Sequence, residues 1–179
     1  MDPEKSRIGK RSSKKGATFE RWTAKELSLW LSGGNADDWF VRSRGSGAAS
    51  WVKRQRTGKE IANQAGDISA NSAEAMPFSK NVCIECKHYK NLALYQFFGG
   101  TAKRPLLLSV FLAAARKTEK KLWLVVKENH ASPLIMLAGT VLHSPVGIVG
   151  KYDSEGDYLE YTIQPLESFL KAVHPSQFR

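Results

Sequence analysis

The stretch VCIECKHYK, Val82–Lys90, decides how this sequence folds. Its β-branched, aromatic and cysteine residues predict a strand, whose side chains alternate between two faces. One predicted face carries Val82, Ile84 and Cys86, and the other carries Cys83, Glu85 and Lys87. Glu85 and Lys87 thus project side by side. An exposed sheet face would explain this pair, but the apolar neighbours favour a buried strand, where charges persist when they pair, bind metal or do chemistry.

A second acid, Asp67, lies at the start of a predicted short strand in the stretch GDIS, and a third, Glu20, lies on a predicted helix. Paired carboxylates supply the hard oxygen ligands that Mg²⁺ prefers, and a nearby lysine can stabilise charge that develops on a reacting phosphate. The alternatives are a turn-forming aspartate, a solvent-facing strand lysine and an exposed helix acid.

Asp67 followed by Glu85-Cys86-Lys87 resembles the signature of the PD-(D/E)-x-K nucleases. Within that superfamily, residues 14–90 are most similar to archaeal-type Holliday junction resolvases. The resemblance is carried by KGATFER, with Lys15, Gly16, Glu20 and Arg21, and by RSRGSG, with Arg42, Ser43, Gly45, Ser46 and Gly47. Gly66 stands where these nucleases often have proline, and the insert between Ala48 and Ala65 is longer than the compact resolvase pattern.

The resemblance implies a restriction-endonuclease-like α/β fold: a three-layer core with a central mixed sheet flanked by helices. It implies a divalent-metal-dependent endodeoxyribonuclease using Mg²⁺, with Mn²⁺ able to substitute. Asp67, Glu85 and the backbone carbonyl of Cys86 would bind the metal, and Glu20 would assist directly or through water. Lys87 would stabilise charge or orient water, and Ser46 would contact the scissile phosphate unless it serves only the turn.

The charge of the chain is positive and uneven, with a net charge of +10. Residues 1–60 contain 14 Lys and Arg against 7 Asp and Glu. This distribution suits a polyanion, although a solubilising tail and a solvated loop would also produce it. The candidate DNA-binding residues are Lys14, Lys15, Arg21, Arg42, Arg44, Lys53, Arg54, Arg56 and Lys59. We expect the basic insert at about 49–65 to overhang the active-site face.

Hydrophobic periodicity predicts the elements around the motif. A helix is expected from Thr18 to Gly33-Gly34, with Trp22 and Trp30 in the core, after a loose basic arm at 1–15. Strands are expected at 39–44, after Asp67 and at 82–89, as antiparallel neighbours joined by loops too short for crossover helices. Further elements are a helix at 105–118, a strand in KLWLVVKEN, another strand or its continuation in PLIMLAG, a turn at 154–157 followed by a strand, and a closing helix after Pro165.

The length of 179 residues suits a single nuclease domain, 16–179. Cys83 and Cys86 have a zinc-like or redox-like spacing, but no second Cys/His pair accompanies them. We expect two buried or half-buried strand thiols, in a reducing compartment, that diverge to opposite faces. The basic start has no signal-peptide run, and no stretch is long and apolar enough to span a membrane. The expected location is the cytoplasm, of the host if a phage encodes the chain, which its small stand-alone form would suit.

Three functions compete at this point. The first is a structure-selective endonuclease acting as a homodimer on four-way junctions or other branched DNA, because a C₂ dimer supplies two symmetric sites. The second is another PD-(D/E)-x-K endonuclease, restriction-like, nicking or homing, that acts on duplex DNA. The third is a catalytically silent DNA-binding protein. All the acids of the signature are present, which favours the two enzymes.

Overall fold

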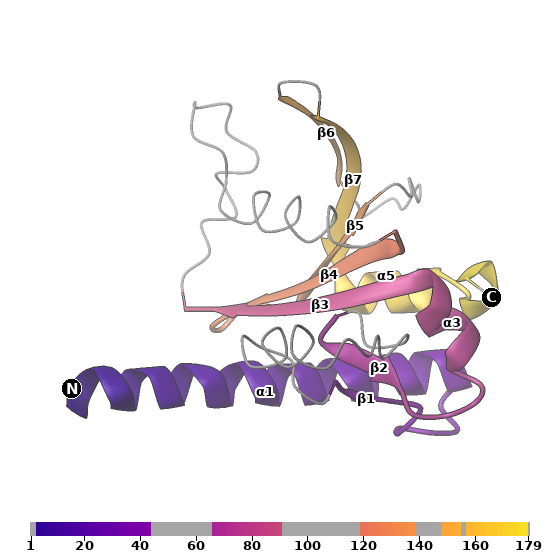
Figure 1. The fold of residues 1–179 in the computed structure, drawn as a ribbon. Helices are drawn as coiled ribbons and strands as arrows, with labels where there is room; N and C mark the ends of the chain where they lie inside the picture. The colour runs from indigo at the N-terminus through magenta and orange to yellow at the C-terminus, as the bar shows by residue number, and fades with distance from the viewer. Residues whose placement is uncertain (1–2, 44–65, 91–118, 139–147, 155–156, 179) are drawn as a thin grey trace, which may run out of the picture.

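The computed structural model describes residues 3–43, 66–90, 119–138, 148–154 and 157–178 (Figure 1). The elements are α1 (Pro3–Ser32), β1 (Phe40–Arg42), β2 (Ile68–Ala70), α3 (Met76–Asn81), β3 (Val82–Tyr89), β4 (Lys121–Glu128), β5 (Leu134–Ala138), β6 (Ile148–Ser154), β7 (Asp157–Pro165), α5 (Leu166–Ala172) and a 3₁₀ turn η2 (Pro175–Phe178). Among the described residues, α1 is followed by two strands, and α3 by five strands that precede α5.

Five strands form a mixed sheet in the order β3-β4-β5-β7-β6. Strands β3 and β4 are parallel, and every other pair in this sheet is antiparallel. Strands β1 and β2 form a separate antiparallel pair beside the edge strand β3. The predicted α/β fold with a central mixed sheet, consistent with the restriction-endonuclease-like architecture, is confirmed. The helix predicted at 105–118 lies outside the described residues.

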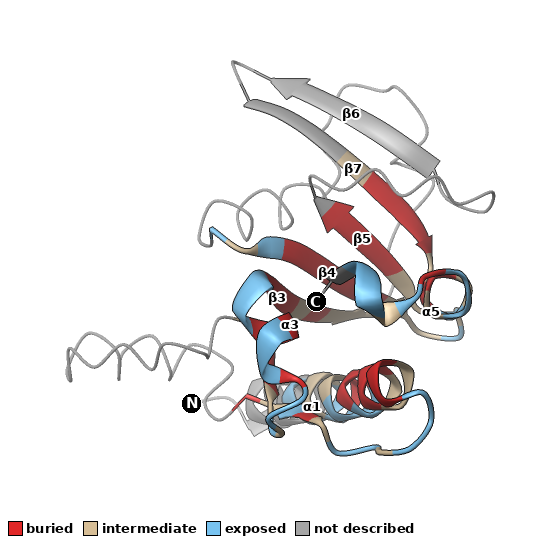
Figure 2. Cartoon of the chain, turned by 90° about the vertical axis from the view of Figure 1, so that its right-hand side faces the viewer, coloured by how far each residue is buried: buried red, intermediate tan, exposed pale blue. Residues whose placement is uncertain are grey.

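The core lies between the sheet and the helices α1 and α5. Figure 2 shows buried residues on the central strands and on the side of α1 that faces them. Five aromatic residues pack here through ring contacts, with centroids 5.0 to 6.1 Å apart: Trp30, Phe40, Phe78, Trp123 and Phe169. The indole N–H of Trp30 also donates to the carbonyl of Val173 at 2.9 Å. This cluster joins α1 to α5 and holds the C-terminal segment on the sheet.

The first helix ends as predicted but begins earlier. Gly33 and Gly34 adopt positive φ angles of 65° and 88°, and the N–H of Gly34 donates to the Leu29 carbonyl at 2.7 Å, which closes the last turn. The predicted start at Thr18 is wrong, as is the loose arm, because α1 is helical from Pro3. Thr18 donates its hydroxyl to the Lys14 carbonyl within the helix instead of capping it. Lysine and arginine are good helix formers, and extending a helix needs no new nucleation.

The connection before β3 was also predicted incorrectly. Residues 76–81 form α3, where the sequence predicts a turn-rich link. This helix lies in the connection between β2 and β3. The backbone at Gly66 bridges Ile84 of β3 in the parallel direction, whereas the sequence predicts antiparallel neighbours. Strands β1 and β2 do pair antiparallel as expected. Trp22 is a further correction, because it is 38% exposed and not part of the core.

Candidate active site

The backbone of Asp67 is fixed between β1 and β3. Its N–H donates to the Ile84 carbonyl at 2.7 Å, and its carbonyl accepts from the Ser43 N–H at 2.8 Å. Its side-chain Oδ2 accepts a third bond, from the Cys86 N–H, at 2.9 Å. Three bonds therefore set both the position and the orientation of this carboxylate. The contributions of Ser43 and Cys86 could not be read from the sequence, because both use backbone groups of distant residues.

Gly66 permits the close approach of Asp67 to β3. It has a φ of 95°, and a Cβ built on it would lie 2.4 Å from the Ile84 carbonyl oxygen. Proline, with φ near −65°, does not fit this conformation. The departure from the proline of the superfamily signature therefore has a steric cause in this chain.

The side chains of Glu85 and Lys87 meet on one face of β3, as the alternation predicts. Lys87 Nζ lies 3.0 Å from Glu85 Oε2 and 3.6 Å from Asp67 Oδ2. The side chains are partly enclosed, with exposed fractions of 35% for Lys87, 24% for Glu85 and 13% for Asp67. Two carboxylates thus converge on one cation at a half-buried position.

This arrangement changes the proton affinity of the groups. Burial, followed by the charge of Glu85, raises the pKa of Asp67, although the Cys86 N–H and Lys87 oppose the change. Burial alone would lower the pKa of Lys87, but Glu85 and Asp67 outweigh it and raise that pKa above its ordinary value. Lys87 is therefore an ammonium at neutral pH.

The two cysteines are free and buried, as predicted. Cys86 faces the core, and its thiol pKa is raised by burial and then by the charge of Asp67, with smaller contributions from Glu20 and Glu85. The charges of all three acids of the predicted site therefore act on this thiol. In an extended strand the N–H and C=O of one residue point to the same edge, so the Cys86 carbonyl faces the edge where Asp67 lies.

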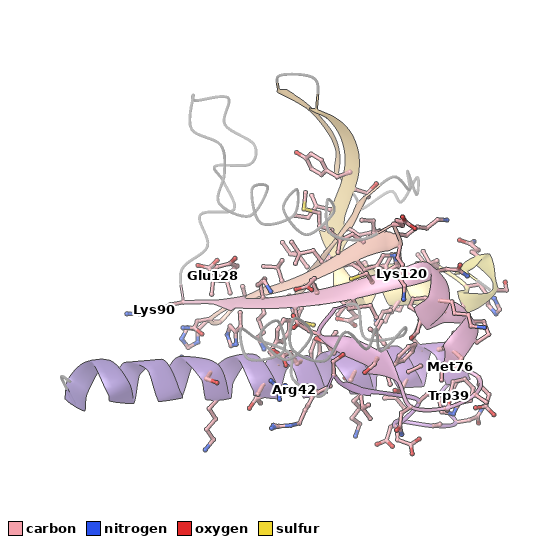
Figure 3. The ribbon with its side chains drawn as sticks, in the orientation of Figure 1. Trp39, Arg42, Met76, Lys90, Lys120 and Glu128 are labelled. Carbon is pink, nitrogen blue, oxygen red and sulfur yellow. The ribbon has the colours of Figure 1, made fainter. Side chains whose placement is uncertain are left out.

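The helix acid Glu20 has a cationic partner. Its Oε2 forms a salt bridge with Nε of Arg42, which Figure 3 shows beside α1. The structure shows Arg42 paired with Glu20, and its predicted role in binding DNA stays a prediction. The side chain of Glu20 is 13% exposed, so this pair is largely enclosed.

The other predicted site residues divide into two groups. Lys14, Lys15 and Arg21 are exposed on α1. Ser46 and the cations Arg44, Lys53, Arg54, Arg56 and Lys59 lie outside the described residues, so their roles stay predictions.

The oxygen donors of the site are of the kind that a divalent cation binds. No cluster of three or more His, Cys, Asp or Glu side chains arranged to hold a metal occurs among the residues with described positions. Two carboxylates do converge on the Lys87 ammonium within 4 Å, and a backbone carbonyl faces the same edge. These are oxygen donors of the kind that a hard divalent cation takes, and such a cation commonly fills its remaining positions with water and phosphate.

An acid at the start of one strand, with Glu-x-Lys on the neighbouring strand of a mixed α/β sheet, defines the class of PD-(D/E)-x-K nucleases. The chain belongs to the family described as "Phage putative PDDEXK endonuclease", whose model matches residues 11–179. The protein is thus a nuclease hydrolase of a phage family that acts on DNA, and nucleases of this class typically use divalent metals.

Comparisons with curated proteins and with solved structures found no match. In the described part of the chain, no helix is both long and apolar enough to cross a membrane.

Proposed function

We propose that this chain is a divalent-metal-dependent endonuclease that hydrolyses phosphodiester bonds in branched DNA, with Asp67, Glu85 and Lys87 as its catalytic residues. The observation that carries the proposal is the convergence of the Asp67 and Glu85 carboxylates on the Lys87 ammonium, at 3.6 and 3.0 Å. A charged cluster half-buried at a strand edge costs folding free energy, and active sites commonly retain such clusters.

Asp67, Glu85 and the Cys86 carbonyl are the residues that would hold the metal, with Glu20 as a further ligand once it is released from Arg42. When bound, Mg²⁺ would lower the pKa of a water ligand and neutralise charge on the phosphate; Mn²⁺ should substitute. Raised proton affinity at Asp67 fits this role, because a carboxylate crowded by a second acid gains from a nearby cation.

The residues of the chain have separate tasks in the reaction. Water attacks phosphorus in line, the phosphorus–oxygen bond opposite breaks, the attacking water loses a proton, and the leaving oxygen gains one. Lys87 carries a proton at neutral pH, so it acts as a cation and not as a base: its ammonium would turn to a phosphate oxygen as negative charge builds there. The three hydrogen bonds on Asp67 keep its carboxylate in place throughout.

Branched DNA is proposed on the sequence resemblance to junction resolvases over residues 14–90, and a homodimer is proposed with it. Two strands of opposite polarity must be cut symmetrically at a four-way junction, and a C₂ dimer presents two equivalent sites. The alternative substrate is linear duplex DNA, cut by a restriction-like, nicking or homing enzyme of the same family.

The deciding experiment compares a synthetic four-way junction, a linear duplex of the same sequence and a single strand, each with Mg²⁺, with Mn²⁺ or with EDTA. Wild type is compared with Asp67→Asn and with the control Glu167→Gln, whose carboxylate forms an exposed ion pair with Lys171 on α5. We expect metal-dependent cleavage of the junction by wild type and by the control, and none by Asp67→Asn.

Each other outcome decides against part of the proposal. Preferred cleavage of the linear duplex would support the restriction-like alternative. Undiminished cleavage in EDTA would exclude a metal-dependent reaction. DNA binding without cleavage under any condition would show that the chain is a catalytically silent DNA-binding protein. Sedimentation equilibrium tests the dimer, and a monomer that cuts one junction strand at a time would contradict it.

A further inference from the structure

A groove of about 530 Å³ lies between α1 and the ends of β3 and β4. Apart from Thr18, the side chains that line it are aromatic or basic: Lys14, Lys15, Phe19, Trp22, His88 and Lys127. None of the described residues that line it is acidic. The residues come from three elements that are far apart in the sequence, so the groove exists only in the folded chain.

The pairing of β3 with β4 and the packing of α1 build the groove. His88 and Lys127 are register partners in the parallel pair, so their side chains share the face that looks toward α1. Phe19 contacts the His88 ring with centroids 5.7 Å apart, and Trp22 stacks on Phe19 at 5.8 Å with planes 13° apart. The wall of the groove is therefore a continuous run of rings.

Trp22 presents a large aromatic surface to solvent at this point. It is 38% exposed, although its helix neighbours Phe19 and Ala24 are buried. Lys127 Nζ lies 5.8 Å from the centroid of the Trp22 ring, within the range of a cation–π contact. Lys14 and Lys15 are exposed on the preceding turns of the helix. An aromatic platform among cations matches the chemistry of single-stranded nucleic acid, which presents flat bases and a negative backbone.

The groove is next to the candidate active site. His88 follows Lys87 in β3, a step of about 3.3 Å along the strand, with its side chain on the opposite face. Figure 3 shows Lys90 and Glu128 at the ends of β3 and β4, beside the N-terminal half of α1. A DNA strand that passes the edge of β3 at Lys87 can therefore reach the groove within a few nucleotides.

We propose that this groove binds an unpaired nucleotide of the DNA substrate, with its base stacked on Trp22 and its flanking phosphates contacted by Lys14, Lys15 and Lys127. The inference rests on the proposed function only in taking DNA as the substrate. Bases inside an intact duplex are stacked on one another and cannot enter the groove. The groove therefore selects DNA in which a base is accessible close to the cleaved bond, such as a branch point, a gap or a single-stranded end.

The test measures binding in EDTA, where cleavage does not interfere, by fluorescence anisotropy. The probes are a blunt duplex, the same duplex with a single-stranded extension, and the extension alone. Trp22→Ala should weaken binding of the two probes with unpaired bases by about tenfold, within the range known for one stacked base, and leave blunt-duplex binding within about twofold. Trp22→Phe keeps a ring and should retain most of the affinity.

The lysine contribution is tested through salt dependence. Lys127→Gln should lower the log–log salt slope on the single strand by about 0.7, the value for one phosphate contact. The control is Lys25→Gln, which changes an exposed lysine of α1 that pairs with Asp37 at 3.3 Å, and it should leave the slope unchanged. Circular dichroism melting shows whether each variant is folded before binding is measured.

The outcomes separate this inference from the proposed function. If Trp22→Ala loses affinity equally for all three probes, or for none, the nucleotide site is excluded. If the groove binds unpaired bases as expected but no DNA is cleaved with any metal, the proposed catalytic activity is contradicted and the nucleotide site stands. If Trp22→Ala binds and cleaves a junction with the wild-type affinity and rate, the proposed nucleotide site is contradicted and the catalytic proposal stands.

Discussion

The backbone N–H of Cys86 donates a hydrogen bond of 2.9 Å to Oδ2 of Asp67, across 19 positions of sequence. This bond connects the two halves of the nuclease signature. It places the carboxylate of Asp67 against the strand that carries Glu85 and Lys87, and it favours the ionised form, which opposes the rise that burial causes in the pKa of Asp67. The orientation of Asp67 is thus set by the main chain of β3.

Removing either acid should abolish cleavage. Asp67→Asn and Glu85→Gln each delete one candidate metal ligand, and we expect a larger loss of rate than the about 10- to 100-fold typical of outer-shell partners. DNA affinity in EDTA should stay equal or improve, because a negative charge facing phosphate is removed. Single-turnover cleavage and anisotropy on the same substrate measure both. Wild-type cleavage by both variants would remove these acids from the mechanism.

Lys87→Ala should reduce the rate constant with little effect on affinity. Its ammonium is expected to contact the phosphate most strongly in the transition state, so we expect a loss of about 10²- to 10³-fold in cleavage at saturating enzyme. The measurement is a single-turnover rate as a function of enzyme concentration. A weaker affinity at an unchanged saturated rate would identify Lys87 as a phosphate anchor instead.

The raised pKa of Asp67 predicts a pH-dependent gain in stability for Asp67→Asn. In the folded chain Asp67 binds its proton more tightly than at its ordinary pKa of 3.8, so its contribution to the unfolding free energy falls as the pH rises through the folded pKa. Glu85 and Lys87 are the charged groups that face it. In metal-free buffer, Asp67→Asn should melt above wild type at pH 7, and the difference should shrink toward pH 3.8. A difference in Tm that does not change with pH would contradict this assignment.

Gly66→Ala should destabilise the chain by more than about 1 kcal/mol, because it combines a positive φ with a contact to the β3 backbone. Gly66→Pro, which restores the residue common in the superfamily, should also fail. Gly34→Ala is the matched control, since Gly34 has a similar φ of 88° and no atom within 4 Å of its added Cβ. Urea unfolding of the variants separates backbone strain from the steric contact. Equal losses of unfolding free energy in Gly66→Ala and Gly34→Ala would show that the contact with Ile84 adds no destabilisation.

The basic insert is expected to contact phosphates without setting the chemical rate. Changing Arg54 and Arg56 together to Ala should weaken duplex binding and flatten the log–log salt slope by about one to two units. The saturated cleavage rate should change little. Affinity measured against salt on a junction and a duplex in parallel tests this. An unchanged slope on both substrates would show that Arg54 and Arg56 do not contact DNA and belong to a solvated loop.

The sequence by itself determined the features that depend on local geometry. The period-two alternation of β3 places Glu85 and Lys87 on one face whatever the strand pairs with, and the Gly33-Gly34 pair ends α1 because glycine adopts positive φ at low cost. The strands at 121–128 and 134–138 were predictable for the same reason. The α/β class and the nuclease signature follow from these elements.

Only the tertiary structure decided the contacts between distant segments. The parallel pairing of β3 with β4, the Cys86 bond to Asp67 and the exposure of Trp22 each depend on which backbones approach, and periodicity within one segment does not encode that. The helical spacing of Trp22 placed it in the core, yet the ends of β3 and β4 leave it beside a groove. The reason is physical: side-chain alternation is imposed by the covalent backbone, whereas burial and strand pairing are set by packing free energy between elements far apart in the chain.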